Sequence, residues 1–220
     1  MKKFSLYILF ALVAVMTTTF TSCKETDNDD QEFADWKTTN ETYFDQKYAE
    51  VKADTLRGDS HWKIIRTWNY EANVATHSYD HILVDVQEAG KGSGCPLYTD
   101  SVKVHYTGRL IPSKSYADGY MFDRSWSGKV FNDSTAVPSK FSVSGVVTGF
   151  TTALMSMHIG DKWRVYIPYQ LGYGSDAKVG AAYSTLIFDI ELVAYYRANS
   201  KTKAPAKDGA KASRGEWIYE

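Results

Sequence analysis

The sequence has few of the residues that build the common catalytic and metal centres. Its 220 residues include only two cysteines, and no cysteine cluster accompanies its five histidines, so neither a metal nor another cofactor is expected. The G-x-S-x-G motif of serine hydrolases is absent. The glycine-rich stretch at 90–94 lacks the spacing of a phosphate-binding loop. These absences argue against an enzyme built on a nucleophile or on a bound phosphate.

Charge and hydropathy exclude two further classes of protein. The net charge is −1, so nothing in the overall balance argues for a nucleic acid partner. The apolar run at 4–16 is shorter than the roughly 20 residues that cross a bilayer. Aromatic residues are by contrast plentiful, at 15% of the chain, which suits a β-rich domain with a sizeable core.

The first 30 residues have the pattern of an export signal followed by a tether. Residues 1–3 are basic, residues 4–16 are apolar, and Ser22 precedes Cys23, which predicts a signal peptide over 1–22. The Ser22-Cys23 junction resembles a bacterial lipobox, so Cys23 is expected to be acylated after cleavage; a plain secretory signal cut near the same point is the alternative. Residues 23–30 are predicted to form an acidic, solvated tether.

This start also resembles the surface-export signal of Bacteroides-type lipoproteins. We therefore expect a cell-envelope lipoprotein, held in the outer membrane by the lipid anchor on Cys23. Both faces of the outer membrane, periplasmic and external, remain alternatives for the position of the protein.

Residues 31–78 are predicted to form an extension of a helix and a strand. Apolar residues recur near helical spacing over residues 31–54, with no proline or glycine between them, and Gly58 ends the pattern. The apolar side of this helix must pack on its own domain or on a second copy of the chain. A homodimer through the helix therefore remains one alternative.

Alternating apolar and polar residues predict an antiparallel sheet with one short helix. The expected strands are 62–68, 81–86, 102–106, 141–143, 163–167 and 185–194. The last strand is apolar nearly throughout and is therefore expected at the centre. Gly149-Phe150 opens a helix over 151–157 that Gly160 stops. This pattern predicts an α+β domain over 79–195, followed by a flexible basic tail over 196–220.

Five segments in a fixed order resemble the FK506-binding-protein (FKBP) family of peptidyl-prolyl cis-trans isomerases. They are Val-Lys-Val-His-Tyr-Thr-Gly at 102–108, Phe122-Asp123, Val146-Val147-Thr148-Gly149-Phe150, Ile167-Pro168 with Tyr173-Gly174, and Ser-Thr-Leu-Ile-Phe-Asp-Ile-Glu-Leu at 184–192. The resemblance covers about residues 79–195. It implies a sheet wrapped half around a helix, with an apolar proline pocket between them.

The resemblance also implies roles for individual residues. Those that match the lining of the proline pocket are Tyr106, Phe122, Val146, Val147, Phe150, Tyr173 and Phe188. Asp123 matches the carboxylate at the pocket rim, and Tyr173 the hydroxyl that binds a ligand. The backbone N–H of Val147 would contact the ligand carbonyl. Phe150 stands where the family usually has a tryptophan as the pocket floor.

Four departures from the family pattern affect the walls of that pocket. Residues 111–119 form a longer loop, and a second insertion after Asp123 carries Trp126 and Phe131. Ser139 stands where an aromatic residue often walls the pocket. The Ile-Pro before the last strand is replaced by residues 179–183, in which Val179 is expected to supply the branched side chain.

The resemblance implies an isomerase that assists the folding of exported proteins. Its expected partners are proline-containing polypeptides and macrolides like FK506 and rapamycin. Retention of Asp123, Tyr106 and Tyr173 favours the enzyme. The altered loop at 179–183 favours the alternative, a catalytically weak binding module or chaperone.

Overall fold

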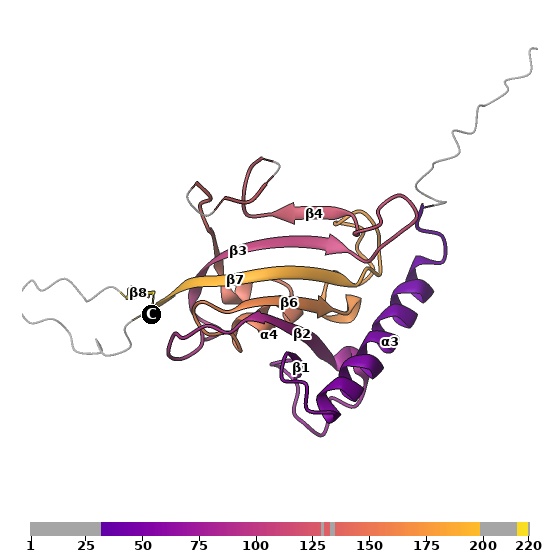
Figure 1. Cartoon of the computed structure of the whole chain (residues 1–220), viewed down its shortest axis with the longest axis horizontal. Coiled ribbons are helices and arrows are strands. Elements are labelled where there is room, and N and C mark those ends of the chain that lie inside the picture. The colour runs from indigo at the N-terminus through magenta and orange to yellow at the C-terminus, as the bar shows by residue number, and fades with distance from the viewer. Residues whose placement is uncertain (1–31, 129, 133–134, 199–214, 220) are drawn as a thin grey trace, which may run out of the picture. The chain divides into compact units, whose positions relative to one another are not determined.

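The described part of the chain is organised around one antiparallel β-sheet. The computed structural model describes residues 32–128, 130–132, 135–198 and 215–219. The predicted signal peptide, the tether and Cys23 lie outside these residues. The sheet has eight strands in the order β1-β2-β6-β7-β3-β4, with β5 paired to β3 and β8 paired to β7 (Figure 1). The strands are β1 (Trp62–Arg66), β2 (His81–Glu88), β3 (Ser101–Leu110), β4 (Met121–Arg124), β5 (Ser139–Ser142), β6 (Lys162–Ile167), β7 (Leu186–Arg197) and β8 (Glu216–Ile218).

Strand β7 lies at the centre of the sheet, which confirms the prediction from its apolar sequence. It pairs with β6 on one side and with β3 on the other. Successive side chains of a strand point to opposite faces. Phe188 and Ile190 are therefore buried on one face, while Asp189 and Glu191 are partly exposed on the other. We call the face of Phe188 the inner face and the face of Asp189 the outer face.

The short helix α4 (Thr148–Leu154) covers the inner face. It lies behind the strands in Figure 1, and all its residues after Thr148 are buried. Gly149 lets the helix approach β6 closely, because a Cβ at this position would collide with the side chain of Ile167. The predicted helix thus exists but lies a few residues earlier than 151–157. Three short 3₁₀ segments connect the elements: η1 (Ser78–Asp80), η2 (Val143–Gly145) and η3 (Tyr169–Leu171).

The N-terminal helix α3 (Trp36–Leu56) packs against the chain's own sheet. It runs beside β1 and β2 (Figure 1) and buries Trp36, Asn40, Phe44 and Val51. The helix begins five residues later than residue 31, because Asp35 adopts a left-handed conformation with φ of 52°. The helix was expected to pack on its own domain or on a second copy of the chain, and the structure shows it packed on its own domain.

The prediction of a flexible tail is wrong for its last described residues. Strand β7 continues to Arg197, beyond the end of its pairing with β6 at Glu191. This leaves an open edge, and β8 pairs with it over Tyr195–Arg197. The Trp217 ring also lies 5.6 Å from the Tyr196 ring. A free strand edge with an aromatic partner is the physical reason that this segment is ordered.

Other elements of the structure differ by a few residues from those predicted from the sequence. Strand β4 was not predicted, β1 ends at Arg66 rather than at residue 68, and β3 extends to Leu110. Residue 143 belongs to η2 rather than to β5. In the described part of the chain, no helix combines the length and apolarity that a membrane crossing needs.

Candidate active site

Three buried aromatic rings meet on the inner face between the sheet and α4. Phe150 of α4 lies edge-on to Phe188 of β7, with ring centroids 4.9 Å apart and an interplanar angle of 88°. The Tyr106 ring of β3 lies 6.1 Å from Phe150 and 6.3 Å from Phe188. Edge-to-face contacts at these distances are favourable beyond the area they bury. The three rings form a buried aromatic floor.

Half-buried side chains surround this floor. Phe122 of β4 lies 5.6 Å from Phe188, and Phe141 of β5 lies 5.6 Å from Tyr106 and 6.5 Å from Phe150. Val146 and Val147 precede α4 and pack against the same core. Together these residues form an apolar rim that solvent partly reaches.

Glycine at position 108 is needed for the rim to close on the floor. A Cβ built on Gly108 would lie 2.6 Å and 2.7 Å from two ring carbons of Phe122 and 2.7 Å from a ring carbon of Phe188. No side chain fits at those distances without displacing a ring. Gly108 therefore sets the approach of Phe122 to Phe188.

One carboxylate and two phenols provide the polar groups beside the rings. The Tyr106 hydroxyl donates to Oδ2 of Asp123 over 2.7 Å, and the Arg124 N–H donates to Oδ1 of the same carboxylate over 2.8 Å. Burial, and then the bond to Asp123, raises the pKa of Tyr106. Burial, and then the charge of Asp123, raises the pKa of Tyr173. Both hydroxyls are therefore protonated donors at neutral pH.

The sequence of this region matches a known family. Residues 95–193 match the profile of the FKBP-type peptidyl-prolyl cis-trans isomerases. This part of the chain is an FKBP-type domain. Its floor and rim contain six of the nine predicted binding and catalytic residues, Asp123 and Tyr173 are the polar groups beside them, and Val179 is discussed below.

Curated relatives share this domain. A Trypanosoma cruzi protein named macrophage infectivity potentiator is 37% identical over 134 residues, which are 60% of this chain and 56% of that protein. The FKBP-type 22 kDa peptidyl-prolyl cis-trans isomerase of Escherichia coli is 40% identical over 107 residues, which are 47% of this chain and 45% of the relative. The chain thus spans about half the length of these relatives.

Solved structures of similar proteins were also found. An isomerase of Pseudomonas syringae is 25% identical with a TM-score of 0.47, covering 70% of this chain and 94% of that one. Escherichia coli FkpA is 28% identical with a TM-score of 0.43, covering 70% of this chain and 62% of that one.

The loop that replaces the family's Ile-Pro packs against the segment that precedes β4 in the FKBP-type domain. Val179 is buried, at 8% exposure. A Cβ at the neighbouring Gly180 would lie 3.5 Å from the Tyr120 ring, so the loop contacts the segment that follows the insertion at 111–119. Tyr183 closes the loop in a left-handed conformation with φ of 58°. The structure thus buries Val179, and its role toward a ligand stays a prediction.

Helix α3 holds this loop through buried hydrogen bonds that the sequence did not reveal. The Thr185 N–H donates to Oδ1 of Asn40 over 2.7 Å, and Nδ2 of Asn40 donates to the Trp36 carbonyl over 2.8 Å. The Trp36 indole donates to Oγ of Ser184 over 2.7 Å, and this hydroxyl donates to the Ala181 carbonyl. We call these contacts the α3 clamp. Its only sequence signal is Asn40, a polar residue within the apolar stripe of the helix.

Ser139 stands where the family often has an aromatic wall residue, and Phe141 of the same strand lies against the floor instead. Both residues lie on β5, where Phe141 pairs with Val102 and Ser139 with Val104. They share a face because they are two residues apart. The longer Phe141 side chain reaches Tyr106 and Phe150, as described above. Among the described residues, no group of three or more His, Cys, Asp or Glu side chains is placed to hold a metal ion.

Proposed function

We propose that the FKBP-type domain is a peptidyl-prolyl cis-trans isomerase that acts on proline-containing polypeptides. The observation that carries the proposal is the Tyr106–Asp123 hydrogen bond at the edge of the Phe150–Phe188 floor. The Escherichia coli relative bears the same activity in its name. The geometry combines an apolar surface for a prolyl ring with phenol donors at its edge.

Isomerisation needs no nucleophile, which fits the residues of the site. Amide resonance sets a barrier of about 18–20 kcal/mol. Twisting the C–N bond removes this resonance and leaves the carbonyl less polar than in the planar amide. An apolar surface therefore disfavours the planar form more than the twisted one. Donors fixed where the twisted carbonyl points stabilise the transition state specifically.

The residues of the site have two roles: some form the apolar surface for the prolyl ring, and others donate hydrogen bonds to the substrate. The prolyl ring is placed over Phe150, between the rings of Tyr106 and Phe122, with Val146 and Phe188 completing the apolar surface. The Tyr173 hydroxyl and the Val147 N–H donate to the substrate carbonyls. Asp123 accepts from Tyr106 and so fixes this ring and its own carboxylate at the rim.

A kinetic assay on short X-Pro peptides tests the proposal. The chain is expected to accelerate cis-to-trans conversion, and macrolides like FK506 are expected to inhibit it by occupying the same rings. A rate equal to the uncatalysed one would contradict the proposal. If macrolides still bound, that result would favour the alternative, a binding module or chaperone.

For the whole chain we propose an envelope lipoprotein anchored through Cys23. The export pattern of residues 1–22 supports it, as does the name of a Legionella longbeachae relative, outer membrane protein MIP, which is 36% identical over 113 residues. One acyl chain binds membranes only marginally, so stable anchoring requires two or more. Mass spectrometry of the mature N-terminus should find an acylated Cys23, and the substitution Cys23→Ser should release the protein from membranes.

A further inference from the structure

Two exposed tyrosines lie beside the strand that carries Phe122 and Asp123. Tyr116 belongs to the insertion at 111–119, and Tyr120 is the last residue before β4. Their exposed fractions are 42% and 37%. The ring centroids lie 5.1 Å apart at an interplanar angle of 66°. Large exposed rings that gather on a surface can mark an interaction site, and we call these two rings the tyrosine pair.

The backbone of the insertion fixes the position of the tyrosine pair. The N–H groups of Ser113 and Tyr116 each donate to the carbonyl of the other residue, over 3.0 Å and 3.3 Å. The Leu110 N–H donates to the Tyr120 carbonyl over 2.9 Å. Gly119 turns the chain with φ of 80°, and a Cβ at this position would collide with the Leu110 carbonyl. The insertion is therefore a closed turn that holds both rings.

Tyr120 points to the inner face, which is also the face of the aromatic floor. Its carbonyl bonds to Leu110, and strand alternation places the Leu110 side chain on the same face as position 108. A Cβ at Gly180 would lie 3.5 Å from the Tyr120 ring and 4.0 Å from Cδ1 of Leu110. Both side chains therefore contact the same loop on the inner face.

This loop also leads from the tyrosine pair to the polar groups of the isomerase site. It follows Tyr173, whose hydroxyl is proposed to donate to the substrate. The Tyr183 N–H donates to the Gly174 carbonyl over 2.8 Å and so closes the base of the loop. Between these ends, Gly180 contacts Tyr120. The tyrosine pair therefore borders the same side of the domain as the Tyr173 hydroxyl.

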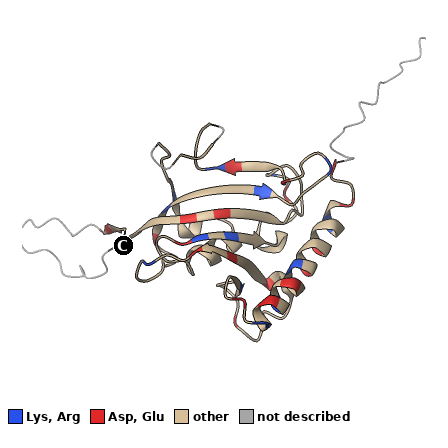
Figure 2. Ribbon diagram, in the orientation of Figure 1, with Lys and Arg blue, Asp and Glu red and all other residues tan. Residues whose placement is uncertain are grey.

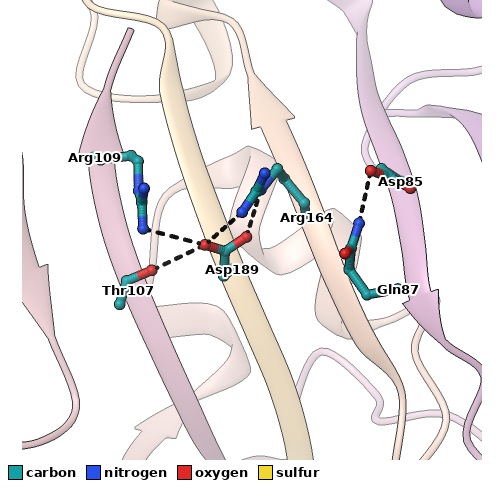
Figure 3. Close-up of polar contacts among 6 residues, drawn as sticks. All are labelled: Asp85, Gln87, Thr107, Arg109, Arg164 and Asp189. Atoms are coloured by element: carbon teal, nitrogen blue, oxygen red, sulfur yellow. Dashed lines mark hydrogen bonds and ion pairs between the residues drawn. The ribbon is translucent and has the colours of Figure 1, made fainter. Parts of the chain in front are cut away.

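The outer face of the same strands is occupied by paired charges. Arg164 and Arg109 donate to Asp189 from two sides, and Thr107 donates to the same carboxylate (Figure 3). Figure 2 shows acidic positions on β7 beside basic positions on β6. An apolar side chain placed over these groups would remove their water. The uncharged tyrosine pair avoids this cost.

A polypeptide that leaves the aromatic floor can run beside β4. In the part of the chain that the structure describes, β4 pairs with β3 alone, so its other edge is free for an extended segment. Extended residues rise about 3.3 Å each, and alternate side chains share a face. Tyr120 lies two residues before Phe122. A substrate with its proline at Phe122 therefore brings the side chain two positions away to Tyr120.

We propose that the tyrosine pair is a subsite for an aromatic side chain of the substrate, two positions away from the proline. The substrate ring packs against Tyr116 and Tyr120, and contacts between aromatic rings are favourable beyond the area they bury. The proposal rests on the isomerase function proposed above and adds a sequence preference to it. Because the insertion departs from the family pattern, the preference is expected of this chain rather than of the whole family.

Exchange between cis and trans peptides, measured by NMR with the full chain, tests the subsite without a coupled protease. One pair of otherwise identical peptides contains Phe-Ala-Pro or Ala-Ala-Pro. A second pair contains Pro-Ala-Phe or Pro-Ala-Ala and covers the opposite chain direction. In at least one pair, kcat/KM should be about three- to ten-fold higher for the peptide with phenylalanine.

Three tyrosine variants locate the source of this ratio. Tyr120→Ala and Tyr116→Ala should each bring the ratio toward one, because each removes half of the aromatic surface. Tyr116 lies in the surface insertion, so its variant is expected to fold even if Tyr120→Ala does not. The matched control Tyr70→Ala removes a ring of similar exposure, 39%, from the loop after β1 and should keep the wild-type ratio.

Equal acceleration of both peptides in both pairs would overturn the subsite and leave the isomerase function standing. The subsite is also overturned if the folded Tyr116 and Tyr120 variants keep the wild-type ratio, or if Tyr70→Ala lowers it as much. Acceleration of no peptide would overturn the isomerase function, and the subsite with it.

Discussion

Removal of the Asn40 side chain should test whether the N-terminal helix supports the isomerase site. Asn40 is completely buried. Its Oδ1 accepts from the N–H of Thr185, the residue that precedes β7, and its Nδ2 donates to the Trp36 carbonyl within α3. The substitution Asn40→Ala leaves the Thr185 N–H without its acceptor in a position that solvent does not reach. Phe188 of the aromatic floor lies three residues further along the same strand.

The expected loss of stability in Asn40→Ala follows from the two hydrogen bonds that the substitution removes. An unsatisfied buried donor costs about 1–3 kcal/mol, and the loss of an ordinary hydrogen bond adds about 0.5–1.5 kcal/mol. The free energy of unfolding should therefore fall by roughly 2–4 kcal/mol. For a protein of this size, each kcal/mol lowers Tm by about 2–4 °C. The unfolding temperature should thus drop by roughly 4–16 °C.

Thermal unfolding and peptide isomerisation should be measured together, well below Tm. We expect kcat/KM to fall several-fold in the folded variant, because the α3 clamp fixes the loop at 181–185. Thr39→Ala is the matched control, since Thr39 lies next to Asn40 and makes only an exposed bond to the Asp35 carbonyl. An unchanged Tm would refute the energetic reasoning. A lowered Tm with unchanged kcat/KM would show that the clamp supports the fold alone.

Four further changes test the site and the core. Tyr173→Phe removes one donor worth about 0.5–1.5 kcal/mol, so kcat/KM should fall several-fold with Tm unchanged; a full loss of activity would mean a larger role. Phe150→Trp should tighten macrolide binding measured by calorimetry if the indole fits, whereas Phe150→Ala should abolish it and cost about 3–5 kcal/mol; binding and turnover intact in folded Phe150→Ala would mean that the ring is only core. Gly108→Ala should displace Phe122 and destabilise by about 1–3 kcal/mol in denaturant unfolding, and wild-type stability would contradict the packing described. Burial raises the pKa of Tyr43 to about 12, so its contribution to stability should be complete below pH 10 and be lost as pH rises toward 12; unfolding curves that do not change over this range would argue against it.

Local patterns in the sequence were sufficient to predict most of the sheet. The apolar run that became β7 identified the central strand, because only a strand covered on both edges and one whole face tolerates so few polar residues. The Gly149-Phe150 pair and Gly160 were sufficient to predict the position of α4 to within a few residues. The grouping of Tyr106, Phe150 and Phe188 came from the family resemblance, and the ring distances agree with it.

Contacts between distant segments could not be predicted from these local patterns. The bond from Thr185 to Asn40 joins residues 145 positions apart, and no local periodicity encodes such a pair. Strand β8 has only three residues, and its pairing depends on the edge that β7 leaves open. The contact of Phe141 with the floor, beside Ser139 at the family's aromatic position, has a similar cause. Both lie on one face of β5, and only the reach of each side chain across the sheet decides between them.

The strands that carry the proposed isomerase site present alternate residues to the two faces of the sheet. Tyr106 and Phe188 point to the inner face, whereas their neighbours Thr107 and Asp189 point to the outer face. The two side-chain sets are separated by one layer of backbone, and Gly108 and Arg109 are adjacent in β3. A substitution that breaks the contact between Arg109 and Asp189 would therefore act on the strand that positions Phe122 through Gly108.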